Sequence, residues 1–150
     1  MKPLLQCRKF KQGKFIPQHP EKYMGDITQI LYRSSWEQKF FFWLDNNPNV
    51  LKWGSEELKI PYVNPLDNRV HEYYIDISLI VQTALGPKKF CIEIKPYKQT
   101  IQPGKRASKE SIRTFITNMA KWKAAKEYCE KMNIEFKVLT ERELFKDGKG

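Results

Sequence analysis

Two carboxylates and one ammonium group are spaced along the middle of this chain so that they can meet at one place. Asp76 stands in the apolar run 74–77, and Glu93 and Lys95 stand in the run 91–95. Because side chains alternate along a strand, Glu93 and Lys95 share a face, with Cα atoms roughly 6–7 Å apart. Carboxylate oxygens suit a hard divalent ion, and a nearby ammonium can offset charge on a phosphate. The three residues therefore predict chemistry that cleaves a phosphodiester bond.

A short connection that contains Gly86-Pro87, a strong turn signal, joins the two runs. If the runs fold back as a hairpin, Asp76 falls opposite Glu93 or Lys95. Both registers place the three side chains on one face of the sheet, because the side-chain period of a strand is two residues.

The expected ion is Mg²⁺, with Mn²⁺ as a substitute, held by Asp76 and Glu93 with the main-chain carbonyl of Ile94 as a further ligand. A lysine close to two carboxylates keeps its proton, so Lys95 is expected to stabilise charge rather than to act as a base. A simpler alternative stays open, in which the acids lie on a solvated strand face and Glu93 and Lys95 form an ordinary charge pair.

A helix is expected to begin at Ser34, because Ser34 and Glu37 fit a capping box, and to end at residues 46–48. Its predicted apolar stripe consists of Trp36, Phe40, Trp43 and Leu44. Two roles are open for Glu37. Its carboxylate either caps the helix through the Ser34 amide or leans toward the predicted metal site.

The remaining pattern predicts an α/β fold with a small mixed β-sheet flanked by helices. Strands are expected near residues 50–53, 58–63, 70–81, 89–96 and 134–139. A long helix starts near Ser108 or Ser111, and the strand after it can join the sheet by a crossover. Asn133 is expected in a left-handed cap, and Thr140 with Glu143 in a second capping box. The long helix has a predicted core stripe of Ile112, Phe115, Ile116, Met119, Trp122, Ala125, Cys129 and Met132.

The chain carries a formal net charge of +10 over 150 residues, which favours a polyanionic partner. Nucleic acid is the expected partner, with an acidic protein or membrane surface as alternatives. Residues 1–150 are expected to form one domain, with a basic, extended N-terminal arm over about residues 1–33 that lies on DNA, on a partner or across the domain. The candidate DNA-binding residues are Lys98, Lys105, Arg106 and Lys109 in a loop, and Lys11 and Lys14 in the arm.

No apolar run approaches the roughly 20 residues of a membrane span, and no secretory signal is evident, so a cytosolic location is expected. The three cysteines, Cys7, Cys91 and Cys129, are far apart, and His19 and His71 lack ligand spacing. The cysteines are therefore expected to be buried free thiols rather than zinc ligands.

These residues together resemble the PD-(D/E)-x-K nuclease superfamily. Within it, most of the chain is similar to the head-completion nucleases of T-even-type tailed phages, which are related to transposon-end endonucleases. The resemblance is carried by residues 32–37, 49–57, 74–76, 93–96, 122–129 and 134–141. One departure is Ile75, where the superfamily motif has proline; that position shapes the strand and supplies no ligand.

The resemblance implies a restriction-endonuclease-like core and a metal-dependent DNA endonuclease, in which Glu37 matches the helix acid, Asp76 and Glu93 the metal-binding acids and Lys95 the lysine. It also implies action on double-stranded DNA after packaging and before tail joining, in the host cytoplasm or the virion. Phage head, neck or portal proteins are the implied partners. The alternative is a structural protein that binds the DNA end or the neck without cutting.

Overall fold

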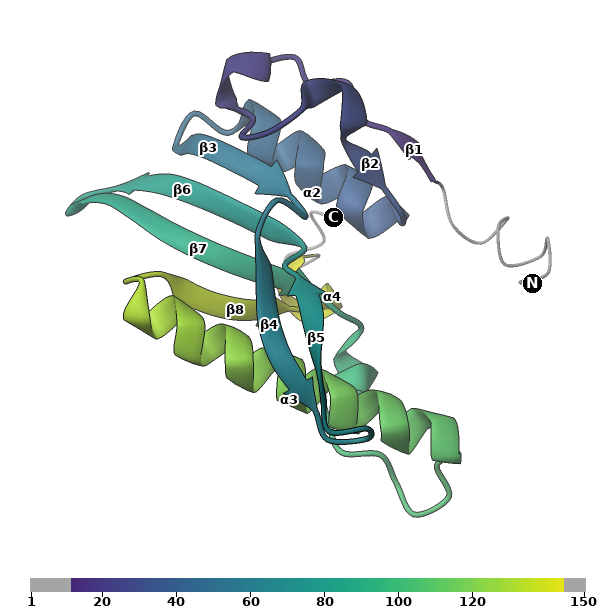
Figure 1. Ribbon diagram of the computed structural model, residues 1–150. Helices are drawn as coiled ribbons and strands as arrows, with labels where there is room; N and C mark the ends of the chain where they lie inside the picture. Colours follow the sequence, from purple (N-terminus) through teal and green to yellow (C-terminus); the bar gives the residue numbers. More distant parts are fainter. Residues whose placement is uncertain (1–11, 145–150) are drawn as a thin grey trace.

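The computed structural model describes residues 12–144, and its centre is a four-stranded sheet in the order β3-β6-β7-β8 (Figure 1). The strands span Val50–Ser55 (β3), Ile77–Thr83 (β6), Gly86–Ile94 (β7) and Glu135–Leu139 (β8). β3, β6 and β7 are antiparallel neighbours, whereas β8 lies parallel to β7. The long helix α3, Lys109–Lys131, makes the crossover that a parallel pair requires, as the sequence predicts.

A separate two-stranded hairpin consists of β4, Lys59–Asn64, and β5, Arg69–Tyr74. The prediction of one strand over residues 70–81 is therefore wrong: β5 ends at Tyr74 and β6 begins at Ile77. The segment changes partners between these two residues. The Ile75 amide bonds to the Leu58 carbonyl (2.9 Å), while the Asp76 carboxylate accepts from the Ile94 amide (2.9 Å). A side chain thus replaces a main-chain ladder bond at this point.

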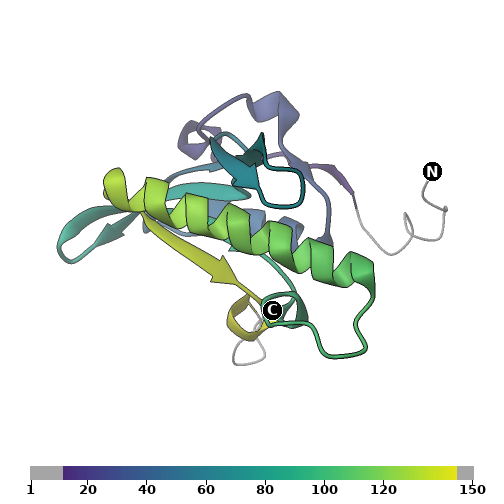
Figure 2. The same ribbon diagram turned by 60° about the horizontal axis from the view of Figure 1, so that its bottom comes forward.

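The two faces of the sheet are covered by different elements. Helix α2, Ser35–Asn46, and residues before it pack on one face, around Phe41, Trp53 and Ile92. Helix α3 and the β4–β5 hairpin pack on the other face, around Ile60, Tyr73, Cys91, Ala125 and Cys129. Figures 1 and 2 show α3 lying along its side of the sheet, with β8 beside it.

Cys91 and Cys129 are buried free thiols, as predicted, while Cys7 lies outside the described residues. Burial raises the pKa of the Cys91 thiol to about 12, and the neighbouring Cys129 adds to this shift. These two cysteines therefore behave as small apolar groups of the core.

The buried stripe of α2 differs by one residue from the predicted one. Phe41 and Leu44 are fully buried, whereas Trp43 is 48% exposed and stacks on Phe40 at the surface (centroids 5.7 Å apart). The prediction assigned Trp43 to the core, but it is Phe41 that packs beside Trp53 there. This one-residue rotation places Glu37 on the buried side of the helix, one turn before Phe41.

The described part of the N-terminal segment is not an extended arm. It contains β1 (Gly13–Lys14), two 3-10 turns (Pro20–Lys22 and Ile27–Gln29) and β2 (Leu31–Tyr32). Tyr23 and Ile30 are buried in the core, so this segment lies across the domain, which was one of the open alternatives. Lys11 lies outside the described residues.

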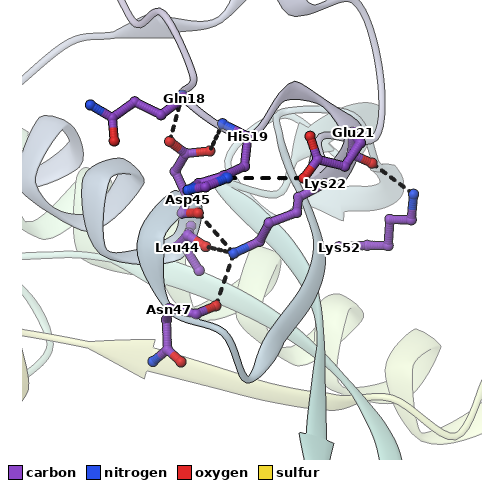
Figure 3. Close-up of polar contacts among 8 residues, drawn as sticks. All are labelled: Gln18, His19, Glu21, Lys22, Leu44, Asp45, Asn47 and Lys52. Carbon is purple, nitrogen blue, oxygen red and sulfur yellow. Dashed lines mark hydrogen bonds and ion pairs between the residues drawn. The ribbon is translucent and has the colours of Figure 1, made fainter.

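Polar contacts fasten this segment to the end of α2 (Figure 3). Asp45, a fully buried carboxylate, accepts hydrogen bonds from the main-chain amides of Gln18 (2.7 Å) and His19 (3.1 Å). The Lys22 ammonium donates to the carbonyls of Leu44, Asp45 and Asn47, each at 2.8 Å. Lys22 thus satisfies carbonyl groups that the end of a helix leaves without partners.

Helix α3 begins after the N-cap Ser108, and Asn133 adopts the predicted left-handed conformation (φ 60°). The predicted core stripe is wrong at its two ends, because Ile112 and Met132 are exposed. Asn118 is buried instead. After β8, Thr140 and Glu143 form the predicted capping box for α4, Glu141–Leu144.

Candidate active site

The register of β6 and β7 decides how the predicted acids meet. Ile77 pairs with Ile92, so the next position outward places Asp76 opposite Glu93. This is one of the two registers that the sequence allowed. Asp76, Glu93 and Lys95 therefore converge where β6 begins and β7 ends, at the end of the sheet where the β4–β5 hairpin departs (Figure 1).

Glu93 is the most enclosed member of this group, with 4% of its surface exposed. Its Oε1 accepts a hydrogen bond from the Tyr73 hydroxyl (2.5 Å), and its Oε2 lies 3.3 Å from Nζ of Lys95. The Lys95 side chain remains 27% exposed. Glu93 is thus fixed from both sides, while the ammonium of Lys95 still reaches solvent.

Asp76 is half-buried, and the carboxylates near it outweigh the positive groups near it. Burial raises its pKa to about 8, and repulsion from the Glu93 and Glu37 carboxylates adds to the shift. The Ile94 amide and the Lys95 ammonium act in the opposite direction but do not cancel it. A site with such unbalanced acids is typical of a place that takes up a proton or a cation.

The Glu37 carboxylate does not fill the first role left open by the sequence, which was to cap the helix through the Ser34 amide. Ser34 caps the helix by accepting from the Glu37 amide (3.1 Å), while the Glu37 carboxylate accepts from the Arg33 amide (2.7 Å) rather than from that of Ser34. Burial raises the pKa of Glu37, and the charges of Glu56 and Glu93 raise it further. Glu37 is therefore close enough to the other acids to feel their charge.

Glu56 adjoins this group. It adopts a left-handed conformation (φ 56°), its amide donates to the Asp76 carbonyl (3.1 Å), and its carboxylate forms an ion pair with Arg33. A left-handed backbone at a glutamate is unusual and recurs near functional sites. The sequence does not reveal this conformation, because left-handed positions are normally recognised by glycine or asparagine, and this one is a glutamate.

The donor set suits a hard divalent ion. Residues 12–144 contain no group of three His, Cys, Asp or Glu side chains able to hold a metal, so the candidate ligands are Asp76 and Glu93 with the Ile94 carbonyl. Mg²⁺ commonly takes one or two carboxylates and completes its shell with water and substrate phosphate. The repulsion that raises the pKa of Asp76 would be relieved by a cation there, so the residues fit such an ion.

The structure brings only part of the predicted basic set near these acids. Lys98, Lys105, Arg106 and Lys109 are exposed in and after the loop that follows β7, and Lys98 borders a groove of about 520 Å³ against α3. Lys14 is exposed on β1, on the side of the sheet that α2 covers. A larger hollow of about 1150 Å³ lies at the opposite end, between the β6–β7 turn and the end of α3, away from the acids.

A mixed sheet with helices on both faces, and acids with a lysine at its end, defines a restriction-endonuclease-like nuclease domain. The chain belongs to the family of the TnsA-like endonuclease N-terminal domain, whose sequence model matches residues 47–141. It is also 41% identical over 138 residues to the head completion nuclease of Enterobacteria phage T4. That alignment covers 86% of this chain and 90% of the phage protein.

These two matches confirm the predicted relation to phage head-completion nucleases and transposon endonucleases. The family match includes Asp76, Glu93 and Lys95, whereas Glu37 precedes it. No helix within residues 12–144 has the length and apolar character to cross a membrane.

Proposed function

We propose that this chain is a metal-dependent endonuclease that cuts double-stranded DNA during completion of a phage head. The observation that carries the proposal is the convergence of Asp76, Glu93 and Lys95 at one end of the sheet. Family membership and the name of the phage T4 relative support the same conclusion.

Asp76, Glu93 and the Ile94 carbonyl would hold the ion, Mg²⁺ or Mn²⁺. When bound, such an ion supplies positive charge to the phosphate and lowers the pKa of water. Tyr73 keeps Glu93 in one orientation, and the Ile94 amide does the same for Asp76. The protein thus holds two oxygen ligands in place before substrate arrives, which lowers the cost of reorganisation.

Lys95 donates hydrogen bonds to phosphate oxygen in this proposal. Its ammonium lies 3.3 Å from a Glu93 oxygen, so the two side chains form an ion pair at the end of β7. Because part of the side chain is exposed, it can reach a phosphate without leaving Glu93. Glu37, a half-buried acid with a raised pKa, accepts a proton from the attacking water or orients that water.

Substrate and assembly partners follow from charge and from the relative. The net charge of +10 attracts DNA over long range, with Lys98, Lys105, Arg106 and Lys109 as phosphate contacts in the loop after β7. The protein would work in the host cytoplasm, where heads are assembled, beside head, neck or portal proteins. Mature virions are a second place to look for it.

The test is cleavage of supercoiled plasmid DNA by purified protein with Mg²⁺ or Mn²⁺. Asp76→Ala and Lys95→Ala should each abolish cleavage while melting temperature and circular dichroism stay near wild type. Lys52→Ala, an exposed lysine on β3, serves as the control and should cut normally. Residual cutting by both variants would point to a contaminating nuclease. Strong DNA binding without cutting by the wild type would instead favour a structural protein that holds the DNA end.

A further inference from the structure

A groove of about 630 Å³ runs from the candidate active site along the first half of α3. Lys95 lines its side at the end of β7, and Arg113, Asn118 and Lys121 line it from the helix, with two threonine hydroxyls between them. These helix positions recur every three or four residues, so they belong to one face of α3. The sequence predicted an apolar stripe for this helix, and it did not single out Arg113, Asn118 or Lys121.

Asn118 is the residue of this groove that the folded chain leaves unsatisfied. Only 4% of its surface is exposed, and its side-chain amide nitrogen has no hydrogen-bond partner within residues 12–144. Burying a donor without a partner costs stability, so such a group in a native fold needs an explanation, and a bound ion or ligand is one. Because the free group is an N–H donor, the missing partner is an acceptor such as a phosphate oxygen.

The charges of the groove point to the same ligand. Lys95, Arg113 and Lys121 supply three cations, while Glu110 is the one acid among the residues that line it. The Lys121 ammonium lies 5.5 Å from the centre of the Tyr73 ring, and the Tyr73 hydroxyl bonds to Glu93. The groove is therefore continuous with the acids that would act on a phosphodiester bond. Asn118 also borders the neighbouring groove that Lys98 lines, so the two grooves adjoin.

We propose that this groove binds the backbone phosphates of duplex DNA next to the bond to be cut, with the Asn118 amide as hydrogen-bond donor and Arg113 and Lys121 as charged contacts. This inference rests on the proposed nuclease function and extends it, because it names how the substrate is held. Contacts of this type fix the position of DNA without reading its sequence. The groove would therefore set where the backbone lies over Asp76 and Glu93.

The experiment measures binding of a fluorescein-labelled DNA duplex by anisotropy, in EDTA so that no cutting occurs, over a series of salt concentrations. The variants are Arg113→Ala, Lys121→Ala and Asn118→Leu. The matched control is Lys123→Ala, which removes an exposed lysine from the same helix but outside the groove. Melting temperatures of all four variants are measured beside the affinities.

Arg113→Ala and Lys121→Ala should each weaken binding roughly 3- to 10-fold and reduce the slope of log affinity against log salt by about 1, on every duplex sequence. Asn118→Leu should weaken binding roughly tenfold. Its melting temperature should not fall, because the buried amide nitrogen that it removes has no partner within residues 12–144. Lys123→Ala should change affinity less than about twofold, within the range of a general charge effect.

The proposal is overturned if Asn118→Leu and Lys121→Ala bind as the wild type does, if Lys123→Ala weakens binding as much as they do, or if the wild type binds no duplex. Cleavage in Mg²⁺ tests the nuclease function separately from binding in EDTA. Groove-dependent binding without cleavage in Mg²⁺ would remove the endonuclease proposal and keep the groove. Cleavage by the wild type, with normal DNA binding by the groove variants, would do the reverse.

Discussion

The Tyr73 hydroxyl donates a 2.5 Å hydrogen bond to Oε1 of Glu93, although the two residues belong to different sheets. Tyr73 lies on the β4–β5 hairpin, and Glu93 lies near the end of β7. Burial of the ring and the charge of Glu93 raise the pKa of the tyrosine, so it remains a hydroxyl donor at any working pH. The hairpin is thus a support for a residue of the candidate site.

Tyr73→Phe should therefore lower the rate of DNA cleavage roughly 10- to 100-fold, the usual effect of losing a group that orients a metal ligand. Duplex binding in EDTA should stay unchanged, because phenylalanine keeps the ring that packs in the core. Tyr62→Phe makes the same change at a buried tyrosine on the neighbouring strand and should cut normally. Equal rates for the two variants would show that the hydrogen bond has no part in catalysis.

The raised pKa of Asp76 predicts how stability depends on pH without metal. The pKa is about 8 in the folded protein against an ordinary 3.8, so the folded state binds the proton more tightly than the unfolded chain does. Stability therefore falls as pH rises from about 4 to about 8. Asp76→Asn, which resembles the protonated acid and still accepts from Ile94, should avoid this loss and melt roughly 2–6 °C higher than wild type at pH 8 in EDTA.

Two measurements check this interpretation of Asp76. The difference in melting temperature should shrink toward zero near pH 4, and Mg²⁺ should stabilise the wild type at pH 8 but not the variant. Asp26→Asn serves as a control with the opposite trend, because hydrogen bonds from Thr28 hold the pKa of Asp26 below its ordinary value. A variant less stable than wild type at pH 8 would contradict the repulsion between Asp76 and Glu93.

Variants of Glu37 and Ser34 distinguish a role in DNA cleavage from a role in capping helix α2. Glu37→Gln keeps an oxygen that can accept from the Arg33 amide but removes the charge, so cleavage should fall roughly 100-fold while stability changes little. Ser34→Ala removes the cap of α2 and should cost about 1 kcal/mol, with cleavage at low temperature retained. Thermal melts beside cleavage rates give the comparison. Normal cutting by Glu37→Gln would limit Glu37 to a structural role.

Lys22→Met should destabilise the protein without touching the site. Its ammonium donates to three carbonyls at the end of α2, and hydrogen bonds from a charged donor are worth about 1.5–3 kcal/mol. The expected fall in melting temperature is roughly 4–10 °C. Lys52→Met is the control, because the exposed Lys52 donates to a single carbonyl within residues 12–144, that of Glu21, as drawn in Figure 3. Equal melting temperatures for the two variants would contradict the prediction.

Local patterns predicted the central sheet and its crossover correctly. The Gly86-Pro87 signal falls at the start of β7, directly after the turn at residues 84–85, and the alternation in residues 91–95 was sufficient for the face shared by Glu93 and Lys95. Caps at Ser108, Asn133 and Thr140 depend on bonds between neighbouring residues, which the sequence displays directly. The exact pairing of Asp76 with Glu93 needed the structure, because two registers satisfied the same alternation.

The missed features depend on contacts between distant residues. The break at Ile75 and Asp76 arises because β5 pairs with β4 while β6 pairs with β3 and β7, which no local pattern reveals. The rotation of α2 by one residue depends on Phe41 packing beside Trp53. Asn118 and Tyr73 gain their importance only when α3 and the hairpin lie against β7.

The change of strand partner between β5 and β6 also divides this stretch of chain into a hairpin and a part that belongs to the candidate site. Residues up to Tyr74 form a hairpin whose far turn, at residues 64–69, is distant from the acids, whereas residues from Asp76 onward are tied to them. The turn can therefore accept an inserted tag or fluorophore, whereas a single-residue insertion at Ile75 would shift Asp76 relative to Glu93.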